Sequence, residues 1–184
     1  MDQQRQYPQL SACGINCGLC PRYYTDGSSR CPGCGGIGFE QVRPTCGVIS
    51  CCKRKGIEYC YQCEEYPCPK VAFSDEVDSF ITHKNIHTNF EAIRACGIEA
   101  YQKELAERMD AMQYLLKHYN DGRRKTFYST AANLLCVEDI RTVMHQISET
   151  VDKTLPIKEQ AKQAVALFED MANSRNISLQ LRKK

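Results

Sequence analysis

Cysteine is the residue type that most constrains how this chain can fold. Eleven of its 13 cysteines lie between Cys13 and Cys68, together with nine of its 11 glycines. The 58 residues from Cys13 to Lys70 contain only seven Ile, Leu or Val residues: Ile15, Leu19, Ile37, Val42, Val48, Ile49 and Ile57. So few aliphatic side chains bury too little surface to offset the conformational entropy lost on folding. The sequence therefore predicts that another interaction stabilises this region.

Metal ions bound by thiolates are the simplest candidate for that interaction. Three C-x2-C pairs lie within 50 residues, namely Cys17 and Cys20, Cys31 and Cys34, and Cys60 and Cys63. Two thiolates at this spacing can bind one ion, and the glycines after Cys34 let backbone N–H groups turn toward the sulfurs, as in a zinc or rubredoxin knuckle. A structural zinc site contributes on the order of 10 kcal/mol to folding.

The N-terminal sequence bears on whether these cysteines form disulfides instead. The first ten residues, MDQQRQYPQL, lack the apolar core of a signal peptide, and no apolar run approaches the roughly 20 residues needed to span a membrane. We therefore expect a cytoplasmic protein without a membrane span, in which thiols stay reduced. An odd number of cysteines also cannot pair completely within one chain. An oxidised, secreted scaffold is the alternative.

The stretch CGINCGLC, from Cys13 to Cys20, raises a second alternative. Its C-x3-C-x2-C spacing is the one that radical-SAM enzymes use to hold an iron–sulfur cluster. Those enzymes also need a parallel βα barrel, yet no alternation of apolar strands with helices follows Cys20. The sequence therefore favours assigning these residues to a larger thiolate scaffold.

The order of the cysteine blocks resembles a known family. The stretches CGINCGLCP, CPGC, CGVISC and KRKGIEYCYQCEEYPC are similar to the Cys-rich proteins grouped as domain of unknown function 3795, and LLKHYNDGRRKTFYSTAANLL resembles longer members of that family. The resemblance implies that the chain binds zinc. It implies no particular activity, because the biochemical activity of that family is not established. The family pattern marks as metal ligands Cys13, Cys17, Cys20, Cys31, Cys34, Cys46, Cys51, Cys60, Cys63 and Cys68. It has a small residue at Cys52, whose role as a spare thiol or an alternative ligand stays open.

Ten ligands do not divide evenly into four-thiolate sites. We expect two zinc ions, or three if thiolates bridge, with iron as the alternative because rubredoxin-like knuckles also accept it. Our working division joins the two knuckles around one ion and gives the other ion four further thiolates, with two substitutes. The first site is Cys31, Cys34, Cys60 and Cys63; the second is Cys13, Cys17, Cys46 and Cys51; the substitutes are Cys20 and Cys68. His83 and His87 are considered as further ligands and expected instead to be surface residues.

The part of the chain after the cysteine blocks has helical periodicity. We therefore divide the whole chain into a Cys-rich metal-binding region, residues 10–70, and an α-helical region, residues 71–184. The predicted fold class is α+β, mainly α, with short hairpins in the first region packed on a helical bundle. Apolar residues spaced three or four apart predict helices at about 70–84, 89–97, 98–119, 126–136, 138–151 and 156–173. We expect Cys96 and Cys136 to be small buried residues, and the C-terminal tail to be frayed.

Two classes of function remain open from the sequence. The region from Cys13 to Cys68 contains no histidine, and all-cysteine sites are usually closed and structural. This favours a structural-zinc interaction module with a protein or nucleic-acid partner, its oligomeric state unknown. The alternative is a thiol- or metal-dependent enzyme, redox or iron–sulfur, acting on a small molecule. The formal charge of +2 gives no case for a polyanion-binding protein, because two four-thiolate zinc sites would move it to −2.

Overall fold

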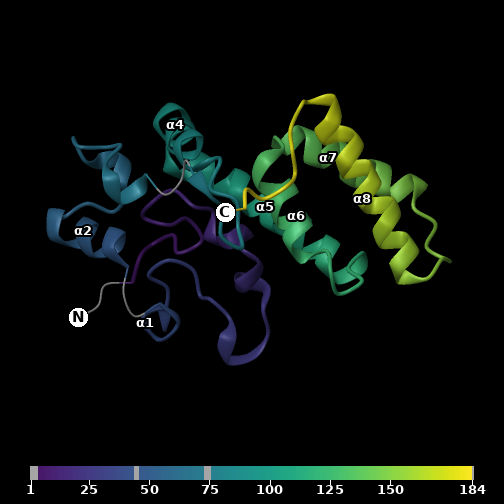
Figure 1. Cartoon of the computed structure of the whole chain (residues 1–184), viewed down its shortest axis with the longest axis horizontal. Coiled ribbons are helices and arrows are strands. Elements are labelled where there is room, and N and C mark those ends of the chain that lie inside the picture. The colour runs from purple at the N-terminus through teal and green to yellow at the C-terminus, as the bar shows by residue number, and fades with distance from the viewer. Residues whose placement is uncertain (1–3, 44–45, 73–75, 184) are drawn as a thin grey trace.

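A computed structural model describes residues 4–43, 46–72 and 76–183 of the chain. The cysteine-rich region lies at one end of the molecule and the long helices at the other (Figure 1). Its α-helices are α1 (Phe39–Val42), α2 (Gly47–Lys55), α4 (Ile86–Cys96), α5 (Ile98–His118), α6 (Lys125–Leu134), α7 (Val137–Thr150) and α8 (Ile157–Ser174). Short 3-10 helices are η1 (Cys17–Leu19), η2 (Pro21–Tyr24), η3 (Gly27–Ser29), η4 (Cys60–Gln62) and η5 (Pro69–Val71).

The predicted α+β class is wrong, because no β-strand occurs in the described parts of the chain. The cysteine-rich region forms tight turns where hairpins were expected. In two of the C-x2-C pairs the backbone N–H of the second cysteine donates to the carbonyl of the first, at 3.1 Å for Cys20 to Cys17 and 3.0 Å for Cys63 to Cys60. Such i to i+3 bonds close a 3-10 turn and leave no extended segment to pair with a neighbour. The mainly α part of the prediction is consistent with the structure.

The helices beyond residue 97 were predicted accurately. Helix α5 begins at Ile98 and ends at His118, and the three helices after it begin and end within two residues of their predicted bounds. The expected helix at 70–84 is wrong in its described second half, since residues 77–83 are irregular, while residues 73–75 lie outside the described ranges. Helix α4 begins at Ile86, earlier than expected, because Asn85 and not Asn89 is its N-cap residue.

Two clusters of buried hydrophobic side chains form the core, and α5 contributes to both. The first cluster joins the cysteine-rich region to α4 and α5, and includes Leu10, Leu19, Cys34, Phe39, Cys52, Tyr59, Cys60, Val71, Phe90, Ile93, Tyr101, Leu105 and Met112. The second joins the end of α5 to α6, α7 and α8, and includes Leu115, Tyr119, Tyr128, Leu135, Ile140, Val143, Ile147, Val165 and Phe168. Because α5 is long enough to reach both clusters, it connects the two regions.

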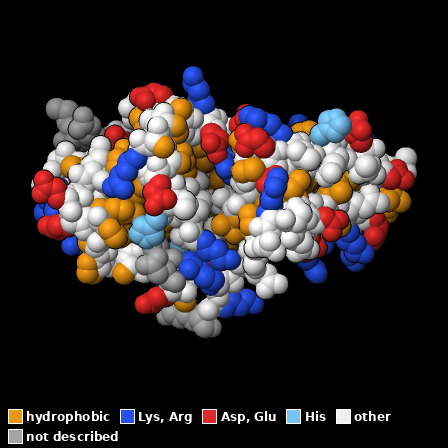
Figure 2. All heavy atoms as spheres, turned by 90° about the horizontal axis from the view of Figure 1, so that it is seen from above, with side chains coloured by type: hydrophobic (Ala, Val, Ile, Leu, Met, Phe, Trp, Pro, Cys, Tyr) orange, Lys and Arg blue, Asp and Glu red, His pale blue; other side chains and the backbone are white. Residues whose placement is uncertain are grey.

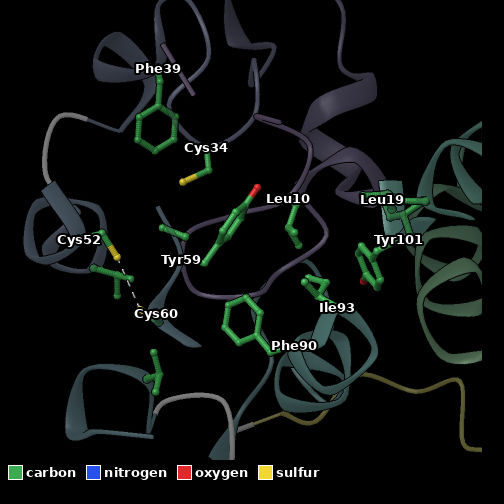
Figure 3. Close-up of a cluster of buried hydrophobic side chains, with 14 of the residues drawn as sticks. Leu10, Leu19, Cys34, Phe39, Cys52, Tyr59, Cys60, Phe90, Ile93 and Tyr101 are labelled. Atoms are coloured by element: carbon green, nitrogen blue, oxygen red, sulfur yellow. Dashed lines mark hydrogen bonds between the residues drawn. The ribbon is translucent and has the colours of Figure 1, made fainter. Parts of the chain in front are cut away.

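Aromatic rings supply much of the core that the aliphatic residues of the cysteine-rich region do not. Phe90 of α4 is fully buried, and its ring centroid lies 4.9 Å from that of Tyr61, 5.5 Å from that of Tyr66 and 6.4 Å from that of Tyr59. Figure 3 shows the rings of Tyr59 and Phe90 as neighbours inside the first cluster, turned edge to face. Buried aromatic rings in such tilted and edge-to-face contacts contribute packing beyond their area alone. Counting only Ile, Leu and Val missed this core.

Buried amides fix the seam between the two regions. The Tyr101 hydroxyl of α5 donates to the Asn16 Oδ1 at 2.9 Å, and Asn89 Nδ2 of α4 donates to the Gly14 carbonyl at 2.8 Å. The Ser129 hydroxyl of α6 donates to the Leu19 carbonyl at 2.6 Å. Hydrogen bonds satisfy these buried polar groups, so the seam is specific as well as apolar.

The C-terminal segment is not frayed, contrary to expectation. It returns toward the middle of the molecule (Figure 1), where the Arg182 backbone N–H donates to Asp78 Oδ2 at 2.7 Å and the Arg182 guanidinium pairs with Asp78 Oδ1 at 2.9 Å. Lys84 Nζ donates to the carbonyls of Ser178 and Gln180. These contacts hold the tail against residues 77–84.

Candidate metal centre

Six cysteines from separate segments of the chain line one cavity of about 300 Å³, which we call the thiol cavity. They are Cys13, Cys17, Cys20, Cys31, Cys34 and Cys46. The rest of the wall is mostly apolar and includes Ile15, Phe39, Val48 and Ile81. Six of the ten predicted ligands therefore face a shared space.

Tight backbone approaches place these sulfurs. The Cys34 N–H donates to the Pro8 carbonyl at 2.7 Å, which holds the second knuckle against the N-terminal arm. Gly33 sits there at φ +87°, and a Cβ at this position would meet the Pro8 carbonyl oxygen at 2.3 Å. Only glycine fits such a conformation and approach. The glycine of C-P-G-C is thus needed to bring Cys34 to the cavity wall.

Burial controls the electrostatics of the thiol cavity. It raises the pKa of Cys13 to about 11, although hydrogen bonds from the Ser11 hydroxyl and the Ile15 N–H oppose it. It raises the pKa of Cys17 well above its ordinary value, and the neighbouring thiols Cys34, Cys13, Cys20 and Cys31 raise it further by charge repulsion. These thiols are close enough that they cannot ionise together unless a cation compensates their charge.

The other five cysteines of the cysteine-rich region, which we call the second group, lie in α2, in or at the end of η4, and at the start of η5. The sulfurs of Cys52 and Cys60 are 3.9 Å apart, as the dashed line in Figure 3 marks. The hydrogen bond between the two thiols lowers the pKa of Cys52 to about 7 and raises that of Cys60, which burial and the charges of Cys52, Cys13 and Cys68 raise further. Lys55 Nζ donates to the Cys63 sulfur at 3.1 Å. Cys51 is half-buried on the same helix.

This arrangement groups the predicted ligands differently from our working division. The knuckle Cys31 and Cys34 faces the thiol cavity with Cys13 and Cys17, whereas Cys60 lies against Cys52, the residue that the family pattern does not mark. Across the described residues, no three His, Cys, Asp or Glu side chains converge closely enough to hold a metal ion. The donor set itself, six thiols that line one cavity, has the chemistry that zinc and iron prefer.

The two histidines have partners within the fold. His83 borders the thiol cavity, but its Nε2 pairs with the Ser79 hydroxyl at 3.1 Å and its Nδ1 with the Val77 carbonyl at 2.9 Å. His83 is buried, so the expectation of a surface residue is wrong for it. His87 Nδ1 pairs with the Tyr66 hydroxyl.

The two cysteines of the helical region are exposed, which corrects the expectation that they are buried. Cys96 is the last residue of α4, next to Gly97. Cys136 is the N-cap residue of α7, where its sulfur accepts a hydrogen bond from the Asp139 N–H at 3.4 Å. Both stand at helix ends, where a side chain projects away from the packed face.

The most informative residue that sequence reasoning missed is Arg5. Its guanidinium lies over the ring of Tyr59, 4.6 Å from the centroid, and its side chain is only 9% exposed. Burial raises the pKa of Cys34, and the charge and hydrogen bonding of Arg5 oppose that rise. No periodicity or motif marks an arginine in the N-terminal arm, so only the folded chain reveals it.

Residues 9–73 match the family model described as a protein of unknown function, DUF3795. The cysteine-rich part of the chain is therefore similar to this family, as the order of its cysteine blocks predicted. The match covers all eleven cysteines of the thiol cavity and the second group, and ends before α4. No match was found among curated proteins or among solved structures.

Proposed function

We propose that this protein binds zinc through the thiolates of its cysteine-rich region and that the ions are structural. The observation that carries the proposal is the thiol cavity, which is lined by cysteines distant from one another in the sequence. Buried thiols gain little from packing alone, whereas a divalent cation would compensate their charge and crosslink the segments that carry them. The cavity would then hold one or two ions and the second group another.

Two features favour structural over catalytic ions. The donors that face the cavity are thiols, and the ring nitrogens of His83 are hydrogen-bonded to other groups. A closed set of sulfur ligands leaves no open position for substrate. The ions would thereby fix a surface for a protein or nucleic-acid partner. Ile37, in the loop after the second knuckle, is 81% exposed and is the kind of side chain that such a partner would cover.

The face of the molecule in Figure 2 carries acidic and basic side chains interspersed, with one group of Lys and Arg side chains near the middle of the view. A partner bound mainly by charge would require a broader surface on which the charged side chains all have the same sign. This face therefore suits a protein partner better than an extended nucleic acid. Among the described residues no helix is long and apolar enough to cross a membrane.

A redox or iron–sulfur enzyme is the second candidate, and the size of the cavity favours it. At about 300 Å³ the thiol cavity reaches the lower end of the range for small-molecule sites, and its wall is largely apolar. A cluster, or an ion together with a small substrate, would use that volume better than one ion.

Elemental analysis after anaerobic purification tests the proposal. We expect about two zinc ions per chain, or three if thiolates bridge. A brown protein with iron and acid-labile sulfide would support the second candidate instead. Protein purified in its native state with neither metal would contradict both.

A further inference from the structure

Three arginines of the cysteine-rich region have aromatic neighbours and no acidic partner. The guanidinium carbons of Arg22 and Arg43 lie 5.4 Å and 5.6 Å from the centroid of the Phe80 ring. That of Arg30 lies 5.7 Å from the centroid of the Tyr23 ring. Among the residues that the structure describes, no Asp or Glu forms an ion pair with any of the three. An arginine can rest its planar face on a ring and still present its forked N–H donors to a carboxylate.

The three arginines gather around the short helix α1. Arg43 follows this helix directly, and Val42, its last residue, borders both the thiol cavity and a neighbouring hollow of about 350 Å³. Arg22 and Arg43 line the thiol cavity, whereas Arg30 lines the neighbouring hollow. Their positive charges therefore lie on both sides of one element.

Two exposed apolar side chains belong to the same surface. Ile37, two residues before α1, is 81% exposed and borders the neighbouring hollow with Arg30. Phe80 borders the thiol cavity and is 38% exposed. Single exposed apolar side chains are ordinary, but several of them rimmed by polar groups mark an interaction site. We call this set the arginine surface, which consists of Arg22, Arg30, Ile37, Arg43 and Phe80.

We propose that the arginine surface binds an acidic peptide segment of a protein partner, whose carboxylates pair with the arginines and whose apolar side chain covers Ile37. The guanidinium fork matches both oxygens of a carboxylate, and arginine and aromatic side chains are enriched at protein interfaces. Ile37 is aliphatic and offers no ring for a base to stack on, which favours a peptide over a single-stranded nucleic acid. This inference rests on the proposed function, in which metal ions fix the loops that carry the surface.

Fluorescence anisotropy with labelled synthetic peptides tests the inference on the full-length protein. We expect a short peptide of Glu and Leu residues to bind. The same peptide with Lys in place of Glu should not bind, and one with Ser in place of Leu should bind more weakly. Added salt should also weaken binding, because it screens exposed charge pairs.

Variants at exposed positions locate the binding site without disturbing the fold. Arg30 and Arg43 are both exposed, and the double variant R30M/R43M should weaken binding of the Glu–Leu peptide about 10-fold. I37S should also weaken it, because the apolar contact is lost. The matched control is R141M/K162M, which removes two exposed charges from α7 and α8. It should leave peptide binding unchanged.

Three results would overturn the inference: equal binding by wild type and R30M/R43M, equal binding of the Glu and Lys peptides, or tighter binding of a single-stranded oligonucleotide than of the Glu–Leu peptide. The zinc content of the same samples separates this inference from the proposed function. A zinc-loaded protein that binds no acidic peptide would overturn the inference alone. A protein that binds the peptide at the arginine surface without zinc would overturn the structural role of zinc and leave the surface standing.

Discussion

The cysteine-rich region and the helices α5 to α8 order their backbones by different means. In α5, 21 residues satisfy one another's backbone groups in regular succession, and a stripe of apolar side chains attaches the helix to its neighbours. In the cysteine-rich region, helices such as η1 and η4 are only three residues long, and isolated bonds connect separate segments, such as that from the Cys60 N–H of η4 to the Ala12 carbonyl. The comparison teaches that regular hydrogen bonding can be replaced by side-chain crosslinks, here an aromatic core and the proposed metal ions.

Metal removal is the sharpest way to separate the two regions. If zinc crosslinks the thiol cavity, a strong chelator under reducing conditions should remove on the order of 10 kcal/mol of folding free energy per site. Amides of residues 9–72 should then exchange rapidly with solvent, while those of α7 and α8 stay protected. Hydrogen exchange measured by mass spectrometry checks this. Equal loss of protection in both regions would mean that they unfold as one unit.

Replacing Phe90 tests whether the first hydrophobic cluster joins the regions. Phe90→Ala removes a fully buried ring that packs on Tyr59, Tyr61 and Tyr66, and should cost about 3–5 kcal/mol. The matched control is Phe168→Ala, of similar cost, in the second cluster. Chemical unfolding gives the free energies, and chelator competition gives zinc retention. We expect Phe90→Ala alone to weaken zinc retention; no such difference between the variants would separate the aromatic core from the metal centre.

The pairing of Asp78 with the C-terminal segment predicts a pH dependence. Burial tends to raise the pKa of Asp78, but the Arg182 side chain and the backbone N–H groups of Arg182 and His83 outweigh it and lower the pKa to about 2. A lowered carboxyl pKa stabilises the fold above the ordinary value of 3.8, and this contribution is lost as pH falls through 2.

Asp78→Asn measures that contribution. The free energy of unfolding should differ from wild type by about 2 kcal/mol near pH 6, and the difference should shrink toward zero as the pH falls to about 2. Both proteins lose their metal in acid, so the effect of that loss cancels in the difference between their free energies of unfolding. A difference that stays constant with pH would assign the effect to packing.

The smallest expected effects concern the two cysteines outside the cysteine-rich region. Cys96→Ser and Cys136→Ser should change stability by less than about 1 kcal/mol, since both side chains are exposed and serine is a good N-cap residue for α7. Zinc content should stay at the wild-type value. In the metal-loaded protein, alkylation followed by peptide mapping should label these two cysteines first. If Cys13 or Cys17 were alkylated before Cys96 and Cys136, the cavity thiols would not be protected by metal, and the proposed difference between the two regions would be wrong.

The sequence by itself determined the helices α5 to α8 and the extent of the cysteine-rich segment. Helices depend on contacts between residues three and four apart, so the spacing of apolar residues along the sequence is enough to predict them. The cysteine blocks can be recognised for a similar reason, because two of the three C-x2-C pairs close their own local turn. The boundary of the family segment followed from their order.

Only the tertiary structure decided which cysteines face one another and what surrounds them. Cys34 joins Cys13 and Cys17 because a glycine lets its loop approach Pro8, and Arg5, from outside the family segment, packs over the ring of Tyr59. The absence of hairpins from the described cysteine-rich region, the aromatic core around Phe90 and the docking of the tail on Asp78 were likewise invisible. Each depends on contacts between residues far apart in the chain, which no local spacing encodes, because the free energy of such contacts exists only once the chain has closed around them.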